Sequence, residues 1–179
     1  MKTVYVFLIT HFEETEALTT VDILRRAGVN VLTVSLTGES IVTSSHNIPV
    51  KADMLFDEVT FDTAEMLVIP GGTPAFSQHE GLKKEVLTFY NKGGLVAAIC
   101  ASPMVFLNGR KATCFPGFEK YLEGATLCTD QRVVVDGNVI TGRGAGVTID
   151  FALTLVETLK GKAQRDAVAD QMTIGPSFK

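Results

Sequence analysis

The chain has 179 residues, of which 46% are hydrophobic and 20% charged, with 16 glycines and no tryptophan. This length predicts one domain over residues 1–179, and the high apolar fraction without a glycine period excludes collagen-like and disordered classes. The formal net charge of −4, with basic residues that are at most paired, argues against a nucleic-acid-binding face, and no run reaches the roughly 20 apolar residues of a membrane span.

The cysteines and the N-terminus both point to a reducing compartment. Cys100, Cys114 and Cys128 are an odd number without close spacing, which is typical of free thiols. The apolar run at 4–10 is shorter than the core of a secretory signal, and no small-residue cleavage site follows it. We therefore expect a cytoplasmic protein.

Short apolar runs alternate with amphipathic stretches, which is typical of parallel strands connected by helices. The run at 3–9 (TVYVFLI) is apolar throughout and predicts a first strand buried on both faces. The stretch at 14–27 predicts a helix, because its apolar residues share one face and Gly28 follows as a stop signal. A second strand is predicted at 30–36.

The rest of the chain continues this alternation after a turn-rich excursion at 37–59, where a hairpin is one interpretation. The later predicted elements are a strand at 66–69, a helix at 81–90, a strand at 95–99, a short helix at 102–107, a hairpin of 132–135 and 138–141 around Asp136-Gly137, a helix at 148–159 and a possible last helix at 162–172. No repeat or linker divides the chain, and the pattern predicts an α/β fold.

Three predicted strand ends carry residues suited to chemistry. The segment 11–16 follows the first strand, Pro70-Gly71-Gly72 follows the strand at 66–69, and Cys100 follows the strand at 95–99. In open parallel sheets, ligands bind beyond the carboxyl ends of the strands. We expect these three segments to converge.

Cys100 ends a strand and is followed at once by a predicted helix, as in a nucleophile elbow. Amides and the dipole at a helix start favour a thiolate, so we expect a thiol pKa below the usual value of about 8.5. The same amides could bind an oxyanion. The alternative is a buried structural cysteine, which is the interpretation we give to Cys114 and Cys128.

Glu16 lies in the first turn of the predicted first helix and is the candidate partner of Cys100. Because a thiolate and a carboxylate in contact repel each other, one of them must keep a proton. A protonated Glu16 could donate a hydrogen bond and shuttle protons. The alternative, a glutamate that only complements the helix dipole, is preferred for Glu13 and Glu14.

Glycines allow close backbone approach, and Gly71-Gly72 could support an oxyanion hole, although Pro-Gly-Gly is also an ordinary turn. The glycine-rich run at 142–146 lacks both the spacing of a dinucleotide fingerprint and a phosphate-loop lysine. We therefore expect no nucleotide cofactor. The histidines show no metal-site spacing; we place His11 at the pocket and expect His46 and His79 on the surface.

Taken together, these motifs resemble the ThiJ/PfpI superfamily, in the branch of the parkinsonism-associated protein deglycase and its bacterial ThiJ-like relatives. The resemblance covers nearly the whole chain. Its motifs are Glu13-Glu14-Thr15-Glu16-Ala17, Val21-Asp22-Ile23-Leu24-Arg25-Arg26-Ala27-Gly28, Pro70-Gly71-Gly72, Ala97-Ala98-Ile99-Cys100-Ala101-Ser102-Pro103, Thr113-Cys114-Phe115-Pro116, and Gly142-Arg143-Gly144-Ala145-Gly146 with Asp150-Phe151-Ala152.

The resemblance implies a flavodoxin-like three-layer sandwich (class I glutamine amidotransferase-like) with a mostly parallel sheet, and a homodimer. It implies that Cys100 is the reactive, easily oxidised cysteine, that Glu16 is its protonated partner, and that the amides of Gly72 and Ala101 form the oxyanion site. Members are described as glyoxalases or deglycases acting on methylglyoxal and its adducts, as redox-sensing chaperones, or by the older label of thiazole monophosphate biosynthesis proteins.

Three positions depart from the family pattern. Ala101 stands where the protease branch has a histidine, which disfavours a protease because the Cys–His pairing is missing. Phe115 stands at the position of a pocket histidine, a role left to His11. His46 stands at the position of an anion-binding arginine, a role left to Arg25 or Arg26.

Two functions remain open on the sequence. In the first, Cys100 attacks a small 2-oxoaldehyde or a glycated substrate, Glu16 moves a proton between the adjacent carbons, and water releases a 2-hydroxy acid, without cofactor or metal. In the second, Cys100 is a non-catalytic redox sensor that peroxide converts to sulfenic and then sulfinic acid.

Overall fold

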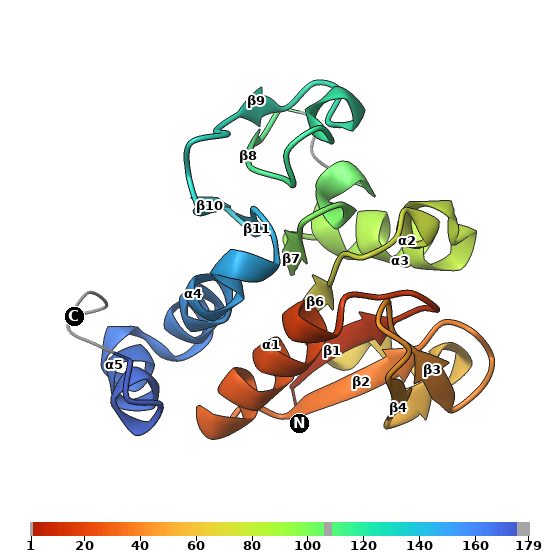
Figure 1. Cartoon of the computed structure of the whole chain (residues 1–179), viewed down its shortest axis with the longest axis horizontal. Helices are drawn as coiled ribbons and strands as arrows, with labels where there is room; N and C mark the ends of the chain where they lie inside the picture. Colours follow the sequence, from red (N-terminus) through yellow and green to blue (C-terminus); the bar gives the residue numbers. More distant parts are fainter. Residues whose placement is uncertain (1, 106–108, 175–179) are drawn as a thin grey trace.

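The computed structural model describes residues 2–105 and 109–174 of the chain. At its centre is a seven-stranded sheet in the order β10-β11-β7-β6-β1-β2-β5 (Figure 1). Every neighbouring pair in this sheet is parallel except β10 and β11, which form an antiparallel hairpin. The strands are β1 (Thr3–Leu8), β2 (Val31–Ser35), β5 (Met54–Leu55), β6 (Ala64–Ile69), β7 (Leu95–Ile99), β10 (Val133–Asp136) and β11 (Val139–Gly142).

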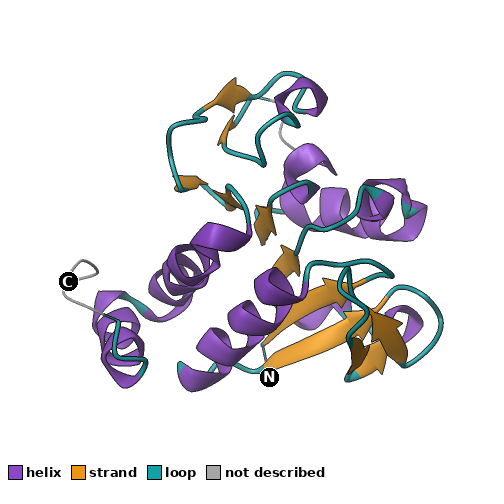
Figure 2. Cartoon of the chain, viewed as in Figure 1, coloured by secondary structure: helices purple, strands orange, loops and turns teal. Residues whose placement is uncertain are grey.

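Helices cover both faces of the sheet, so the predicted three-layer α/β sandwich is confirmed (Figure 2). Alternate residues of β1 belong to different cores: Val4 and Val6 pack with the helices of one face, while Tyr5 and Phe7 pack with those of the other. This explains why the first strand is apolar at nearly every position. The first face carries α1 (Glu14–Arg26), α4 (Thr148–Lys160) and α5 (Lys162–Gln171); the second carries α2 (Ala75–Gln78) and α3 (Glu80–Asn91).

Two small strand pairs lie outside the main sheet. The predicted excursion at 37–59 contains the antiparallel hairpin of β3 (Ile41–Thr43) and β4 (Pro49–Lys51), together with β5 of the main sheet. The second pair, β8 (Lys111–Ala112) with β9 (Thr126–Leu127), is parallel and was not predicted, because two-residue strands leave no periodicity to read. Short 3-10 helices occupy Phe56–Glu58, Phe61–Thr63, Ser102–Val105, Glu119–Tyr121 and Ala145–Val147.

Two local predictions are corrected. The short helix predicted at 102–107 is a 3-10 helix over Ser102–Val105, and residues 106 and 107 lie outside the described part of the chain. In the β10–β11 hairpin, Asp136 pairs with Val139, so the two-residue turn is Gly137-Asn138 and not Asp136-Gly137. Gly137 has φ +61°, which is the left-handed backbone that such a turn requires.

Within residues 2–105 and 109–174, no helix has both the length and the apolar character that crossing a membrane requires.

The packing of α4 on the sheet gives a test of the fold. Phe151 is fully buried, so Phe151→Ala is expected to lower the free energy of unfolding by about 3–5 kcal/mol, through lost burial and the cavity that remains. Thr158 lies on the exposed side of the same helix. Thr158→Ala is therefore expected to change the free energy of unfolding by no more than about 0.5 kcal/mol. Urea denaturation of both variants measures the difference, and equal losses would contradict this packing.

Candidate active site

The three predicted strand ends do converge. The strands β1, β6 and β7 are adjacent and parallel, so the segments after them leave the sheet at one edge. The Glu13 amide donates to the Gly71 carbonyl oxygen at 2.9 Å, and the Gly71 amide donates to Glu16 Oε2 at 2.7 Å. These bonds join the start of α1 to the loop after β6, beside Cys100 at the end of β7.

Cys100 lies in a strained turn, as a nucleophile elbow requires. Its φ is +66°, which a residue with a side chain rarely adopts. Its amide donates to the Gly142 carbonyl oxygen at 2.9 Å, and its own carbonyl accepts from the Phe115 amide at 2.9 Å. The hydroxyl of Ser102 donates to the Pro70 carbonyl oxygen, which ties the elbow to the glycine loop.

Glu16 is 1% exposed although it carries a carboxyl group. Its Oε2 accepts a hydrogen bond from the Gly71 amide, while its buried Oε1 has no hydrogen-bond partner among the described residues. A methyl group placed on Gly71 would lie 2.8 Å from Glu16 Oε2 and 3.0 Å from Cys100 Sγ, so both side chains border this glycine. Burial raises the pKa of Glu16 to about 7, against the lowering effect of the Gly71 amide.

The expected low pKa of the thiol is not what this arrangement produces. Burial, and then the charge of Glu16 and its hydrogen bond, raise the pKa of Cys100 to about 12. The amides of Gly72 and Ala101 act in the opposite direction but are outweighed. The helix after Cys100 is a four-residue 3-10 turn, which supplies little dipole to favour a thiolate. Near neutral pH the pair therefore holds one proton or two, and it titrates as a unit.

The glycine loop leaves no space for side chains. Gly72 has φ +97°, and a methyl group there would lie 2.5 Å from the His11 carbonyl oxygen. The amides of Gly72 and Ala101 both act on the sulfur of Cys100. An oxyanion formed on a carbon bonded to this sulfur would meet the same two donors.

The hydrogen bonds that the structure shows for His11 are made by its backbone. Its φ is +68°, its amide donates to the Thr43 carbonyl oxygen at 2.9 Å, and its carbonyl accepts from Ser45 Oγ at 2.6 Å. The residue is exposed. These bonds attach the loop after β1 to the tip of the β3–β4 hairpin, and the prediction that the imidazole acts in the pocket stays untested.

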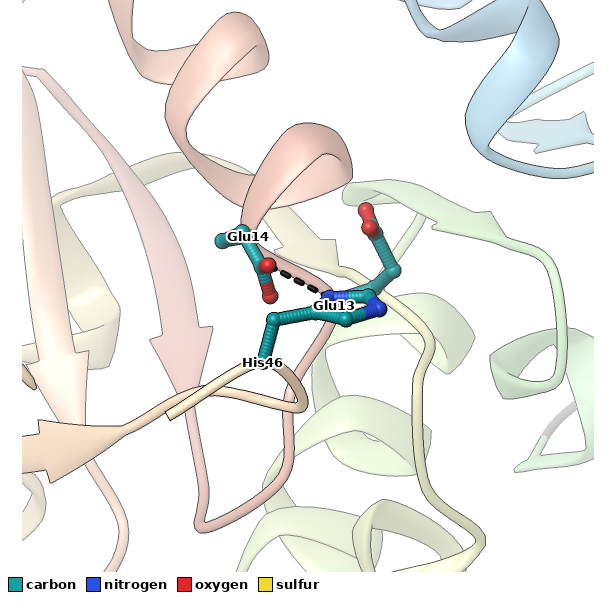
Figure 3. A group of neighbouring side chains, drawn as sticks. All are labelled: Glu13, Glu14 and His46. Carbon is teal, nitrogen blue, oxygen red and sulfur yellow. Dashed lines mark hydrogen bonds and ion pairs between the residues drawn. The ribbon is translucent and has the colours of Figure 1, made fainter. Parts of the chain in front are cut away.

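Glu13, Glu14 and His46 form a group that the sequence did not predict (Figure 3). One potential ligand atom from each lies within 4.8 Å of the others, a spacing that could hold a metal ion. Each group nevertheless has a protein partner: Glu13 Oε2 accepts the Glu16 amide at 2.7 Å, and Glu14 Oε1 lies 2.5 Å from His46 Nδ1. The helix cap and the Glu14–His46 contact thus occupy one oxygen of each carboxylate and one ring nitrogen, while the buried Glu14 Oε2 has no hydrogen-bond partner among the described residues.

The two arginines expected to bind an anion, Arg25 and Arg26, do not lie at the site. Arg25 pairs with Asp53 and Arg26 with Asp22, both at the end of α1 that is remote from Glu16. Ten helical residues span about 15 Å, so neither guanidinium lines the site of its own chain. Arg143 is nearer in the backbone: it directly follows Gly142, whose carbonyl oxygen accepts the Cys100 amide. Its signal is its place in the glycine-rich run at 142–146, which does not fit a nucleotide loop but is one of the motifs of the family resemblance.

The buried carboxyl group gives a pH-dependent test. The pKa of Glu16 is about 7 in the folded chain and near its ordinary value of 4.5 in the unfolded chain, so the folded state is favoured by the neutral acid below pH 4.5 and loses this stability as pH rises to about 7. Glu16→Gln removes the titration. We expect its free energy of unfolding, relative to the native chain, to rise between pH 4.5 and 7.5 by on the order of 3 kcal/mol.

Urea denaturation across this pH range measures the effect, with the exposed Glu39→Gln as the control for loss of one carboxylate. A difference between Glu16→Gln and the native chain that does not vary with pH would show that Glu16 is not held neutral by burial.

Comparisons with known proteins agree with this geometry. A profile described as the DJ-1/PfpI family matches residues 2–158. Protein DJ-1 homolog B of Arabidopsis thaliana is 34% identical over 92% of the chain, although the chain spans only 40% of that protein. The glutathione-independent glyoxalase DJR-1.2 of Caenorhabditis elegans is 33% identical over 87% of both proteins.

The crystal structure of Drosophila melanogaster DJ-1beta superposes with a TM-score of 0.93 at 32% identity, over 97% of this chain and 98% of that one. These likenesses confirm the flavodoxin-like expectation for the sheet and its helices. The chain belongs to the DJ-1/PfpI family.

Proposed function

We propose that the protein is a cysteine-dependent, cofactor-independent glyoxalase or deglycase that acts on methylglyoxal or its adducts. The observation that carries the proposal is the contact of a buried Glu16 with Cys100 beside two backbone donors. A relative of nearly the same length is named a glutathione-independent glyoxalase, which supports the same class of reaction here. The homodimer and the cytoplasmic location remain predictions from the resemblance and the sequence.

The first step forms a carbon–sulfur bond. The sulfur of Cys100 attacks the aldehyde carbon of the 2-oxoaldehyde. As the carbon–sulfur bond forms, the Glu16 carboxylate accepts the proton of the thiol. The carbonyl electron pair moves to oxygen, and the resulting hemithioacetal oxyanion accepts hydrogen bonds from the Gly72 and Ala101 amides. A pKa near 7 suits Glu16 to exchange a proton at neutral pH.

The second step transfers hydrogen between carbons. Glu16 gives the thiol proton to the hemithioacetal oxyanion and is again a carboxylate. It then removes the proton from the former aldehyde carbon and passes it to the neighbouring carbonyl oxygen, which forms an enediol. Finally Glu16 takes the hydroxyl proton of the first carbon and delivers a proton to the second carbon, which leaves a thioester on Cys100 and a hydroxyl group beside it. Water then cleaves the thioester, releases the 2-hydroxy acid and restores the thiol, so no redox cofactor is required.

Redox sensing is the second candidate, and one observation favours it. Cys100 is only partly buried, so a peroxide can reach the sulfur, and the Gly72 and Ala101 amides that act on it would bind the oxygen of a sulfenic or sulfinic acid equally well. Both candidates use the same residues. An enzyme would convert many substrate molecules per chain, whereas a sensor would be oxidised once per chain, and this difference separates the two candidates.

Steady-state production of lactate from methylglyoxal is the decisive measurement. We expect many turnovers per chain, loss of activity below detection in Cys100→Ala, and a loss of at least about a hundredfold in kcat for Glu16→Gln, as for removal of a general acid–base group. Cys128→Ala is the matched control and should keep native activity, because its sulfur contacts the Thr126 carbonyl oxygen and is not among the groups that act on Glu16 or Cys100.

Native-like circular dichroism for all three variants would show that the losses are not losses of fold. Rapid oxidation of Cys100 by peroxide without any turnover would reject the enzyme and favour the sensor. Unchanged turnover in Glu16→Gln would remove the proton transfer from this residue.

A further inference from the structure

A closed ring of three hydrogen bonds holds the start of α1 against the loop after β6. The Glu13 amide donates to the Gly71 carbonyl oxygen at 2.9 Å, and the Gly71 amide donates to Glu16 Oε2 at 2.7 Å. The Glu16 amide in turn donates to Glu13 Oε2 at 2.7 Å. Two side chains take part in this ring, the carboxyl group of Glu16 and that of Glu13, and the second has no part in the chemistry proposed above.

The ring is a capping box into which a peptide unit of another loop is inserted. In an ordinary capping box, the N-cap side chain binds the amide of the third helical residue, whose carboxyl group binds the N-cap amide in return. Glu13 is the N-cap of α1 and Glu16 its third residue, and the first of these bonds is present. The second is replaced by two bonds through Gly71, so the carboxyl group of Glu16 is directed to the glycine loop and not to the amide of Glu13.

The backbone of Glu13 is itself fixed by close packing. A methyl group placed on Gly72 would lie 2.4 Å from the Glu13 nitrogen, so the glycine loop contacts this backbone directly. Phe12, which precedes the cap, and Ala17, in the first turn of the helix, are fully buried in one core cluster, which fixes the angle at which the chain enters α1. The bond from the Glu16 amide to Glu13 Oε2 carries this fixed position into the first turn of the helix.

The carboxyl group of Glu16 has few other restraints. Among the described residues its Oε1 has no hydrogen-bond partner, and its Oε2 accepts the Gly71 amide beside the thiol of Cys100. A shift of the helix start would therefore move this carboxyl group relative to both the loop and the sulfur. Burial raises the pKa of Glu16, and the negative charge of Glu13 acts in the same direction.

We propose that Glu13 is a positioning residue for the reaction: by accepting the Glu16 amide, its carboxylate closes the ring and holds the carboxyl group of Glu16 between Gly71 and the sulfur of Cys100. The inference rests on the proposed function, since the proton transfers assigned to Glu16 are the steps that this position serves. A carboxylate that only complemented the helix dipole would stabilise α1 without directing one particular side chain. Misplacement of a reacting group by about 1 Å can cost about a hundredfold in rate.

The first test is the kinetics of methylglyoxal turnover by the whole chain. We expect Glu13→Ala to lower kcat at least about tenfold while KM stays within about twofold of the native value. Glu13→Gln keeps an acceptor oxygen without the charge, and we expect it to restore kcat to within about threefold of the native value. Glu13→Gly also removes the acceptor but is better tolerated at an N-cap, so it should reproduce the loss in kcat even if Glu13→Ala folds poorly.

His79→Ala is the matched control, because His79 also caps a helix with its side chain. Its Nδ1 accepts the Leu82 amide at 3.0 Å at the start of α3, and its ring contacts Phe56. His79 is not among the groups that act on Glu16 or Cys100. We expect His79→Ala to lower the thermal midpoint at least as much as Glu13→Ala, but to leave kcat within about twofold of the native value. An equal loss of kcat in both variants would overturn the positioning role.

Hydrogen exchange of the Gly71 amide gives a readout that needs no turnover. This amide is bonded to Glu16 and not to the side chain of Glu13, so the loss of a helix cap alone would leave it protected. We expect its exchange, followed by NMR, to be at least about fivefold faster in Glu13→Ala than in the native chain or in His79→Ala. A native exchange rate in Glu13→Ala would overturn the proposal.

The outcomes separate the two proposals. If the native chain does not turn over methylglyoxal, the proposed function fails, whereas faster exchange at Gly71 in Glu13→Ala would still show that Glu13 holds the carboxyl group of Glu16. If the native chain turns over methylglyoxal but Glu13→Ala and Glu13→Gly keep the native kcat, the function stands and the positioning role is overturned.

Discussion

The hydrogen bond from the Gly71 amide to Glu16 Oε2 joins two parts of the fold that the rest of the site depends on. It connects the first turn of α1 to the loop after β6, and it holds a carboxyl group in a position that water does not reach. Burial favours the neutral acid, and the amide favours the carboxylate. The balance of these effects leaves the group able to change its protonation near neutral pH, next to the thiol of Cys100.

The sheet supplies the rigidity behind this arrangement. Cys100 leaves a strand whose last four residues are buried, with β6 on one side and β11 on the other. Its unfavourable φ is maintained by backbone bonds to Gly142 and Phe115, which come from elements on separate parts of the chain. The cost of such a conformation, of order 1–3 kcal/mol, is offset by the packing of the core around it. The fold therefore presents the thiol at a fixed angle, with little freedom to relax away from Glu16.

Much of the site's layout could be predicted from the sequence, because its residues directly follow the carboxyl ends of neighbouring parallel strands. Cys100, Glu16 and Gly71-Gly72 could be placed together from parallel-strand topology alone, and the resemblance supplied the amides of Gly72 and Ala101. The pKa of the thiol could not be predicted in this way. Whether the pKa of Cys100 is raised or lowered depends on how deeply the sulfur is buried and on whether an α-helix or a short 3-10 turn follows it. The local sequence determines neither.

Arg143 and His46 show a second limit of the sequence. The glycines on either side of Arg143 are compatible with a nucleotide loop or a tight turn, and only the contact of Gly142 with Cys100 shows that this segment borders the thiol. His46 meets Glu14 across 32 residues, through a hairpin whose position depends on tertiary contacts. To predict such a contact, one must know the register of the hairpin and its position on the sheet, and turn propensity determines neither.

The tip of the β3–β4 hairpin has a consequence that extends beyond its own two strands. Ser45 and Thr43 hold the backbone of His11, and the carbonyl of His11 faces the α-carbon of Gly72 at a distance that excludes a side chain. The backbone of Gly72, which we propose as an oxyanion donor, is thus braced by a hairpin about 30 residues away in sequence. Insertions or deletions in this hairpin would displace the brace, so we expect the length of the hairpin to be under the same selection as the glycine loop that it supports.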